Sequence, residues 1–115
     1  MSVTDCLGHL GSLVECDTQN PPRAIYGDSA IFNYCSEAVG TSFDIKTWDH
    51  GHGHVSWYAV RGKPRVLFNV HLDTVPVGDG WSSDPHRLRV EEGRAYGRGA
   101  CDIKGAAAAL LTLAE

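Results

Sequence analysis

The first forty residues carry apolar side chains at helical spacing. One face of a helix is marked by four of them, Leu7, Leu10, Leu13 and Val14. Thr4 is the expected N-cap residue of this helix. A second helix over residues 28–39, ended by Gly40, is predicted by a similar set: Ile31, Phe32, Cys35, Ala38 and Val39. The chain therefore opens with two amphipathic helices.

The pattern changes to strand after Gly40. Residues 43–47 and 55–60 predict two strands, joined by a turn at the glycines of residues 51–53. Residues 66–70 are almost continuously apolar, which is typical of a strand covered on both faces by helices. A hairpin over residues 88–96 and an Ala-rich helix over residues 105–115 follow. We expect an α/β fold with a mixed, largely parallel sheet flanked by helices.

Length and composition narrow the class of protein. The chain has 115 residues, which is at most one domain, and a formal charge of −4. No run of Lys and Arg is present, so neither a nucleic acid nor a membrane is an expected partner. Four cysteines lack CxxC spacing and no secretory signal precedes them, which favours free thiols in the cytoplasm. The last helix has no stop signal, so we expect the protein to continue beyond Glu115.

Candidate chemistry first occurs in residues 71–76, His-Leu-Asp-Thr-Val-Pro, directly after the apolar strand. Ligands of open α/β sheets bind beyond the carboxyl ends of the strands. His71 can bind a metal ion through a neutral ring nitrogen, and Asp73, on the same face of an extended segment, can orient it. The alternative is that both side chains only make local hydrogen bonds in a loop.

A second candidate is Asp102, within residues 97–105, Gly-Arg-Gly-Ala-Cys-Asp-Ile-Lys-Gly. The glycines allow a close backbone approach, and Asp102 is expected at the start of the last helix. There it could be no more than an N-cap residue. The glycine spacing fits neither a dinucleotide-binding fingerprint nor a P-loop, which excludes a phosphate-binding loop.

Together, these two segments resemble motifs of the di-zinc metallo-aminoacylase and peptidase family. Its members include acetylornithine deacetylases, succinyl-diaminopimelate desuccinylases and related carboxypeptidases. Trp81 and Pro85 match the family's Trp-x-x-x-Pro loop, which lies between the two motifs. Residues 20–23, Asn-Pro-Pro-Arg, and residues 68–76 look most like the acetylornithine or acetylcitrulline deacetylases of arginine synthesis. The resemblance covers essentially the whole chain, as the N-terminal part (residues 1–115) of a zinc-dependent catalytic domain.

The resemblance implies a role for each site residue. His71 is the expected ligand of one zinc ion, and Asp102 the carboxylate that bridges two. Asp73 is the expected catalytic residue that supports His71 without touching metal. Two Zn²⁺ ions, for which Co²⁺ can substitute, activate water and polarise the amide carbonyl of an N-acyl amino acid. The family also implies a cis peptide bond between Asp102 and Ile103.

Other parts of the family's site have no counterpart in this chain. The family uses a Glu-Glu pair, whose first member is the general base, with a further acidic ligand and a late His. Glu91 and Glu92 are adjacent but are assigned to a solvated turn. The family's dimerisation domain is absent too, so a homodimer is expected of the complete protein, and the 115 residues alone are not expected to be active. The alternatives are a desuccinylase, a dipeptidase or a non-catalytic interaction domain.

Several other residues invite a functional interpretation. His50, His52 and His54 alternate, but the glycines between them favour a solvated hairpin tip over a metal site. Cys101 adjoins Asp102, and a thiol packed beside the metal centre is a better interpretation than a nucleophile, because no base is evident. Arg98 and Lys104 either contact a substrate carboxylate or make structural pairs.

Overall fold

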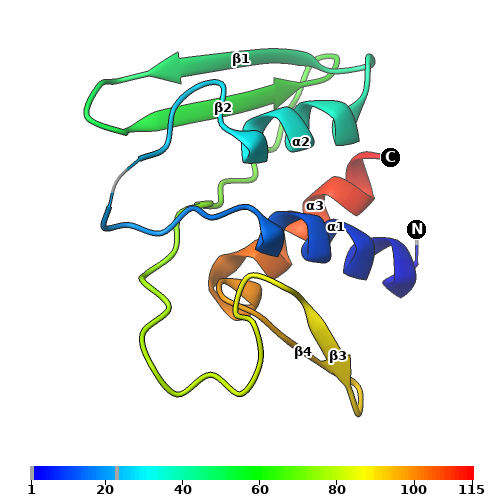
Figure 1. Ribbon diagram of the computed structural model, residues 1–115. Helices are drawn as coiled ribbons and strands as arrows, with labels where there is room; N and C mark the ends of the chain where they lie inside the picture. The colour runs from blue at the N-terminus through cyan, green and yellow to red at the C-terminus, as the bar shows by residue number, and fades with distance from the viewer. Residues whose placement is uncertain (1, 23) are drawn as a thin grey trace.

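Three helices pack together at the centre of the described chain (Figure 1). They are α1 (Val3–Glu15), α2 (Ala30–Val39) and α3 (Gly105–Ala114). The computed structural model describes residues 2–22 and 24–115. The buried apolar side chains all come from these helices: Leu10, Leu13, Val14, Ile31, Phe32, Cys35, Val39, Ala107, Ala108 and Leu111. Most of the residues that marked the two predicted helical faces belong to this core.

The helix ends follow local capping chemistry. Ser2, and not Thr4, is the N-cap residue of α1, so the predicted start was wrong by two positions. Ser2 is extended, and its hydroxyl accepts a hydrogen bond from the backbone N–H of Asp5 at 3.1 Å. Gly40 ends α2 with φ of 70°, a conformation that glycine adopts without strain, as predicted.

Two antiparallel hairpins lie at opposite ends of the helical layer (Figure 1). Near α2, β1 (Asp44–Asp49) pairs with β2 (Val55–Val60), and at the other end β3 (Arg89–Glu91) pairs with β4 (Arg94–Tyr96). The indole of Trp57 in β2 donates to Ser36 of α2 at 3.0 Å, which joins the first hairpin to the core. Both hairpins were predicted from the sequence.

The predicted strand over residues 66–70 is not formed. This segment is irregular, and three of its apolar side chains face solvent: Val66, Leu67 and Phe68 are 66%, 79% and 62% exposed. Val70 packs partly against the helical core. A strand needs neighbours for its backbone N–H and C=O groups, and no described segment pairs with this one. Within the described residues, parallel pairing is limited to one isolated β-bridge, between Gln19 and Thr74. The class is α/β, as expected, but a largely parallel sheet is not formed by the described residues.

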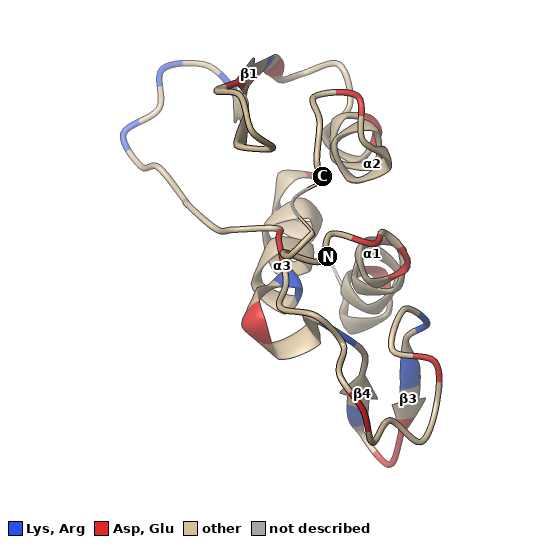
Figure 2. Cartoon of the chain, turned by 60° about the vertical axis from the view of Figure 1, so that its left-hand side comes forward, with Lys and Arg blue, Asp and Glu red and all other residues tan. Residues whose placement is uncertain are grey.

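Basic side chains gather in two places. Lys and Arg lie chiefly in the loop after β2 and in the β3–β4 hairpin, where acidic residues accompany them (Figure 2). Arg61, Lys63 and Arg65 of that loop are exposed, and the chain then runs to His71. None of the helices in residues 2–22 and 24–115 combines the length and the apolar character that crossing a membrane requires.

Candidate functional site

The two candidate segments meet at a pocket of about 240 Å³. His71, Asp73 and Asp102 line it, as the sequence predicted, together with Asn20 and Arg98. These residues come from three separate loops, which follow α1, follow β2 and precede α3. The structure therefore brings together all three predicted site residues, although 31 positions separate His71 from Asp102.

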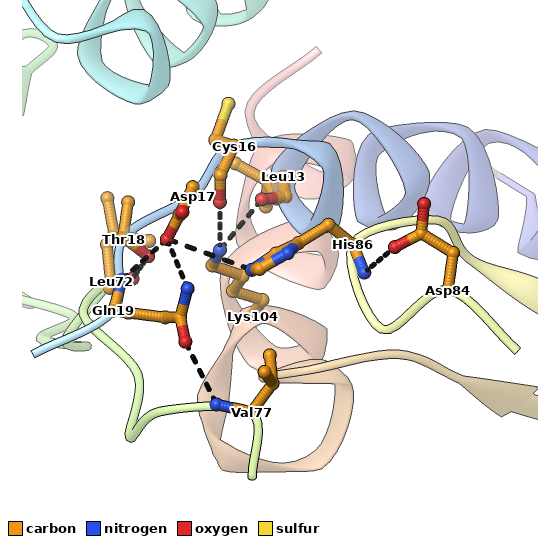
Figure 3. A network of polar contacts seen from close by, with 10 residues as sticks. All are labelled: Leu13, Cys16, Asp17, Thr18, Gln19, Leu72, Val77, Asp84, His86 and Lys104. Atoms are coloured by element: carbon orange, nitrogen blue, oxygen red, sulfur yellow. Dashed lines mark hydrogen bonds and ion pairs between the residues drawn. The ribbon is translucent and has the colours of Figure 1, made fainter. Parts of the chain in front are cut away.

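Hydrogen bonds fix the loop that carries His71 and Asp73. The backbone N–H of Thr74 donates to Thr18 at 3.0 Å, and that of Asn20 donates to Thr74 at 2.7 Å. The hydroxyl of Thr18 donates to the carbonyl of Leu72 at 2.6 Å. The side-chain oxygen of Gln19 accepts from the N–H of Val77 at 2.9 Å (Figure 3). The segment after α1 thus runs beside the site loop and holds it at several points.

Asp102 lies in an irregular turn, η1 (Ala100–Lys104), between Gly99 and α3. Its backbone is not helical, with φ −126° and ψ 87°, and the peptide bond to Ile103 is cis, as the family resemblance implied. The N-cap of α3 is Lys104, so the interpretation of Asp102 as a helix cap is wrong. Because the turn places Asp102 before the helix starts, its side chain is 86% exposed beside His71.

Lys104 holds this turn against α1. Its side chain is 1% exposed, and its ammonium donates to the carbonyl oxygens of Leu13 at 2.8 Å and Cys16 at 2.9 Å (Figure 3). Burial lowers the pKa of Lys104 to about 8, against the opposing charges of Cys16 and Asp17. Of the two interpretations of Lys104, structural pairing is confirmed, because a buried ammonium with two backbone partners does not reach a substrate.

The ring of His71 lies between two acidic residues. Nδ1 is 2.9 Å from the carbonyl oxygen of Asp73 and 3.3 Å from its Oδ1, and Nε2 is 3.0 Å from Oδ1 of Asp102. Partial burial opposes protonation of the ring. The hydrogen bonds to Asp73 and Asp102, with the charges of both, outweigh that effect and raise the pKa of His71 above its ordinary value.

This geometry suits a shared cation. When Nδ1–H donates to Asp73, Nε2 carries a lone pair and faces a carboxylate oxygen, so a proton or a metal ion must lie between the two atoms. Two ligands of a tetrahedral zinc ion lie about 3.4 Å apart, because zinc–ligand distances are about 2.0–2.2 Å. The 3.0 Å separation of Nε2 and Oδ1 is close to this value. His71 and Asp102 therefore fit as two members of a zinc donor set.

The donor set is incomplete within this chain. Across the described ranges, no three or more His, Cys, Asp and Glu side chains gather closely enough to hold a metal ion. The alternating His50, His52 and His54 do not form such a group either. They lie at the β1–β2 turn, where the ring of His50 contacts the hydroxyl of Ser56 at 3.0 Å. A solvated hairpin tip is thus confirmed for residues 50–54.

Two neighbours of the site have structural partners. Arg98 donates to the carbonyl of Val77 at 3.0 Å, and its guanidinium lies 5.2 Å from the centre of the Trp81 ring. Trp81 itself donates to Val77 at 2.8 Å, so the matched Trp-x-x-x-Pro loop is fastened to the site loop. Glu92 lies at the β3–β4 turn with φ of 50°, as assigned, whereas Glu91 is the last residue of β3 and pairs with Arg94.

Asn20 is a site residue that the sequence did not single out. Its side-chain nitrogen donates to Oδ2 of Asp73 at 3.2 Å, and it lines the same pocket. In the sequence, Asn20 was noted only as part of the loop over residues 20–23, whose Arg23 lies outside the described residues. An Asn before two prolines predicts a turn, and no local pattern indicates a contact 53 positions away.

Comparison with known proteins gives the class of this chain. Residues 67–115, which contain His71, Asp73 and Asp102, match Peptidase family M20/M25/M40. This match and the relatives described next confirm the resemblance found in the sequence. Over the matched residues, the chain belongs to this family.

The relatives include enzymes of several specificities. N-acetyl-L-citrulline deacetylase of Xanthomonas campestris is 56% identical over 109 residues, which are 95% of this chain and 30% of that protein. Succinyl-diaminopimelate desuccinylase of Rhizorhabdus wittichii is 36% identical over 108 residues, 89% of this chain and 28% of the relative. Beta-Ala-Xaa dipeptidase of Lactobacillus delbrueckii is 39% identical over 77 residues, 66% of this chain and 16% of the relative. The chain spans less than a third of the length of each.

Proposed function

We propose that this chain forms part of the metal centre of an amidohydrolase that removes the acyl group from an N-acyl amino acid. The observation that carries the proposal is the approach of His71 and Asp102, whose Nε2 and Oδ1 atoms lie 3.0 Å apart on a pocket wall. These atoms are a nitrogen and an oxygen donor of the kind that zinc binds. The match of the same segment to a hydrolase family supports the assignment.

Each site residue takes one role in this proposal. His71 would hold one metal ion through Nε2, Asp102 would be the carboxylate shared by two ions, and Asp73 orients the ring of His71 through Nδ1 and would not bind metal. The metal is zinc, with cobalt as a substitute. Bound zinc would polarise the scissile carbonyl and lower the pKa of the attacking water. The general base and the remaining ligands come from other parts of the complete protein.

N-acetylcitrulline is the first candidate substrate, followed by N-acetylornithine, in arginine biosynthesis. Identity of 56% over nearly the whole chain to an N-acetyl-L-citrulline deacetylase supports this order. A desuccinylase or a dipeptidase on the same scaffold is the second candidate, because relatives with those activities are 36% and 39% identical over shorter or weaker matches. A non-catalytic domain that has kept part of the site is a third.

We further propose that the chain is the N-terminal part of a catalytic domain in a longer, cytoplasmic, homodimeric protein. The relatives are about three to four times as long, and the apolar segment over residues 66–70 has no pairing partner in the described chain. In the complete protein, this segment is a strand of a largely parallel sheet, covered by helices on both faces.

A substrate panel on the protein expressed from its complete gene tests the function. With zinc present, it should release acetate from N-acetylcitrulline or N-acetylornithine faster than it cleaves N-succinyl-diaminopimelate or dipeptides. Replacing His71 with Ala should lower activity and zinc occupancy together. A preference for the succinylated substrate or for dipeptides would select the second candidate. Absence of hydrolysis from every substrate, in a folded protein loaded with zinc, would support the non-catalytic domain.

A further inference from the structure

The carboxylate of Asp73 has a different partner on each oxygen. Oδ1 faces Nδ1 of His71 at 3.3 Å, and Oδ2 accepts the hydrogen bond from Nδ2 of Asn20 at 3.2 Å. The side chain of Asp73 is 44% exposed, so packing alone does not fix the carboxylate, which can rotate about its last bond. Among the described side chains, the amide of Asn20 is the one that donates to Oδ2 of Asp73, and this bond opposes rotation of the carboxylate.

The backbone that presents Asn20 is held independently of its side chain. Its N–H donates to the carbonyl of Thr74 at 2.7 Å, one residue beyond Asp73. Two hydrogen bonds lie on either side of Thr74: Thr18 donates to Leu72, and Gln19 accepts from Val77 (Figure 3). Removing only the side-chain amide should therefore leave the segment in place, so that its contribution to the site can be measured separately from that of the loop.

We propose that Asn20 is a positioning residue of the metal centre. Nδ1 of His71 lies 2.9 Å from the backbone carbonyl oxygen of Asp73. By holding Oδ2 of Asp73, Asn20 also keeps Oδ1 within 3.3 Å of Nδ1, and the ring then directs Nε2 toward Asp102. Asn20 touches neither metal nor the reacting atoms, and acts through Asp73. Partners of this kind, which orient a ligating His through its other nitrogen, commonly contribute about 10-fold or more to metal affinity. The inference rests on the proposed metal centre.

The direct test is the zinc dissociation constant of the complete protein, measured by competition with a chromogenic chelator. Asn20→Leu keeps the approximate size of the side chain and removes the donor, and we expect zinc to bind about 10-fold more weakly. Asn33→Leu in α2 is the matched control, because it makes the same exchange at an exposed Asn that does not line the pocket. It should leave zinc affinity within about twofold of the wild-type value, although it loses the hydrogen bond to the carbonyl of Asp28.

A double-mutant cycle with Asp73→Ala separates positioning from a structural role. If Asn20 acts through Asp73, Asn20→Leu should not weaken zinc binding further once the Asp73 carboxylate is gone. Equal losses in both backgrounds, or equal losses for Asn20→Leu and Asn33→Leu, would overturn the proposal. So would a change in KM for the substrate with unaltered zinc affinity, which would place Asn20 in substrate binding.

The same titration distinguishes this inference from the proposed function. His71→Ala should lose at least one bound zinc ion, whichever residue occupies position 20. If His71→Ala bound zinc as well as the wild type, the proposed metal centre itself would be wrong. If His71→Ala lost zinc while Asn20→Leu kept full affinity, only the role of Asn20 would fail.

Discussion

The ammonium of Lys104 donates to the carbonyl oxygen of Leu13 at 2.8 Å, although 91 positions separate the two residues. It reaches the carbonyl of Cys16 as well, at 2.9 Å. The carbonyl of Leu13 also accepts from the backbone N–H of Cys16 at 3.2 Å, so Lys104 is its second donor. The carbonyl of Cys16 lies just beyond the end of α1, where helix geometry supplies no donor, and Lys104 donates to it. Because Lys104 follows Asp102 by two residues, this bond also fixes the turn that presents Asp102 to the pocket.

Replacing Lys104 with Met should lower the free energy of unfolding by about 1–3 kcal/mol, because the carbonyl of Cys16 loses its donor and that of Leu13 loses one of its two donors. Urea denaturation of the complete protein measures the change. Lys46→Met in β1, where the side chain is exposed, is the matched control and should change stability by less than about 0.5 kcal/mol. Equal stabilities for the two variants would show that the Lys104 bonds contribute little.

Gly105→Ala should disturb the same turn by overpacking. A Cβ atom at Gly105 would lie 2.5 Å from the carbonyl oxygen of Ala100, so the backbone around Asp102 must shift, at a cost of about 1–3 kcal/mol. Gly8→Ala, on the exposed side of α1, meets no atom within 4 Å and should instead stabilise the protein by about 0.5–1 kcal/mol. Thermal unfolding of both variants checks the opposite signs. A neutral Gly105→Ala variant would mean that the turn relaxes freely.

Local patterns were sufficient to predict the helices and hairpins. The spacing of Leu10, Leu13 and Val14 marked the buried face of α1, and Gly40 marked the end of α2, because both depend on residues close in sequence. The apolar run over residues 66–70 predicted a strand that is absent here. Apolar character indicates that a segment is to be buried, whereas strand formation also requires a partner.

The site was only partly predictable, because some of its contacts join residues that are far apart in the sequence. His71, Asp73 and Asp102 lie in motifs whose neighbours in the sequence reveal them, and the structure brings the three together. Asn20 reaches Asp73 across 53 positions through an amide that carries no sequence signature. Asp102 could equally have been a helix cap, and only the non-helical backbone at Asp102 and Ile103 separates the two interpretations.

The stability of the fold should depend on the buried thiol of Cys35 at alkaline pH. Burial raises the pKa of Cys35 to about 11 from 9.0, with a smaller contribution from Cys16. A raised pKa in the folded state means that the unfolded chain ionises first, so this contribution to stability is complete below about pH 9 and is lost as pH rises to about 11. Urea denaturation at pH 8 and pH 10.5 should show the loss.

Cys35→Ala serves as the reference for that measurement. The other titrating groups are common to both proteins, so the fall in stability between the two pH values should be smaller in the variant. An identical fall in both proteins would show that Cys35 ionises with its ordinary pKa. In the folded wild type, a thiol reagent at pH 8 should modify the exposed Cys101 and leave the buried Cys35 unmodified.

The exposed apolar segment predicts a contact with the remainder of the protein. Leu67 is 79% exposed here, so Leu67→Asp would be nearly neutral if the segment stayed in solvent. If the complete protein buries it in a sheet, the same change should cost about 3 kcal/mol or more, because an unpaired charge enters an apolar layer. Val90→Asp, at a 51% exposed position of β3, is the control. Thermal unfolding in which the two variants are equally stable would contradict the proposed burial.

Zinc binding by the complete protein tests the central claim most directly. Native mass spectrometry and chelator competition would compare the wild type with His71→Ala and Asp102→Ala, and with His52→Ala as a control in the β1–β2 turn. We expect up to two zinc ions in the wild type and in His52→Ala. Both site variants should lose bound zinc, because Nε2 of His71 and Oδ1 of Asp102 face one another at 3.0 Å. Full zinc occupancy in folded His71→Ala or Asp102→Ala would contradict it.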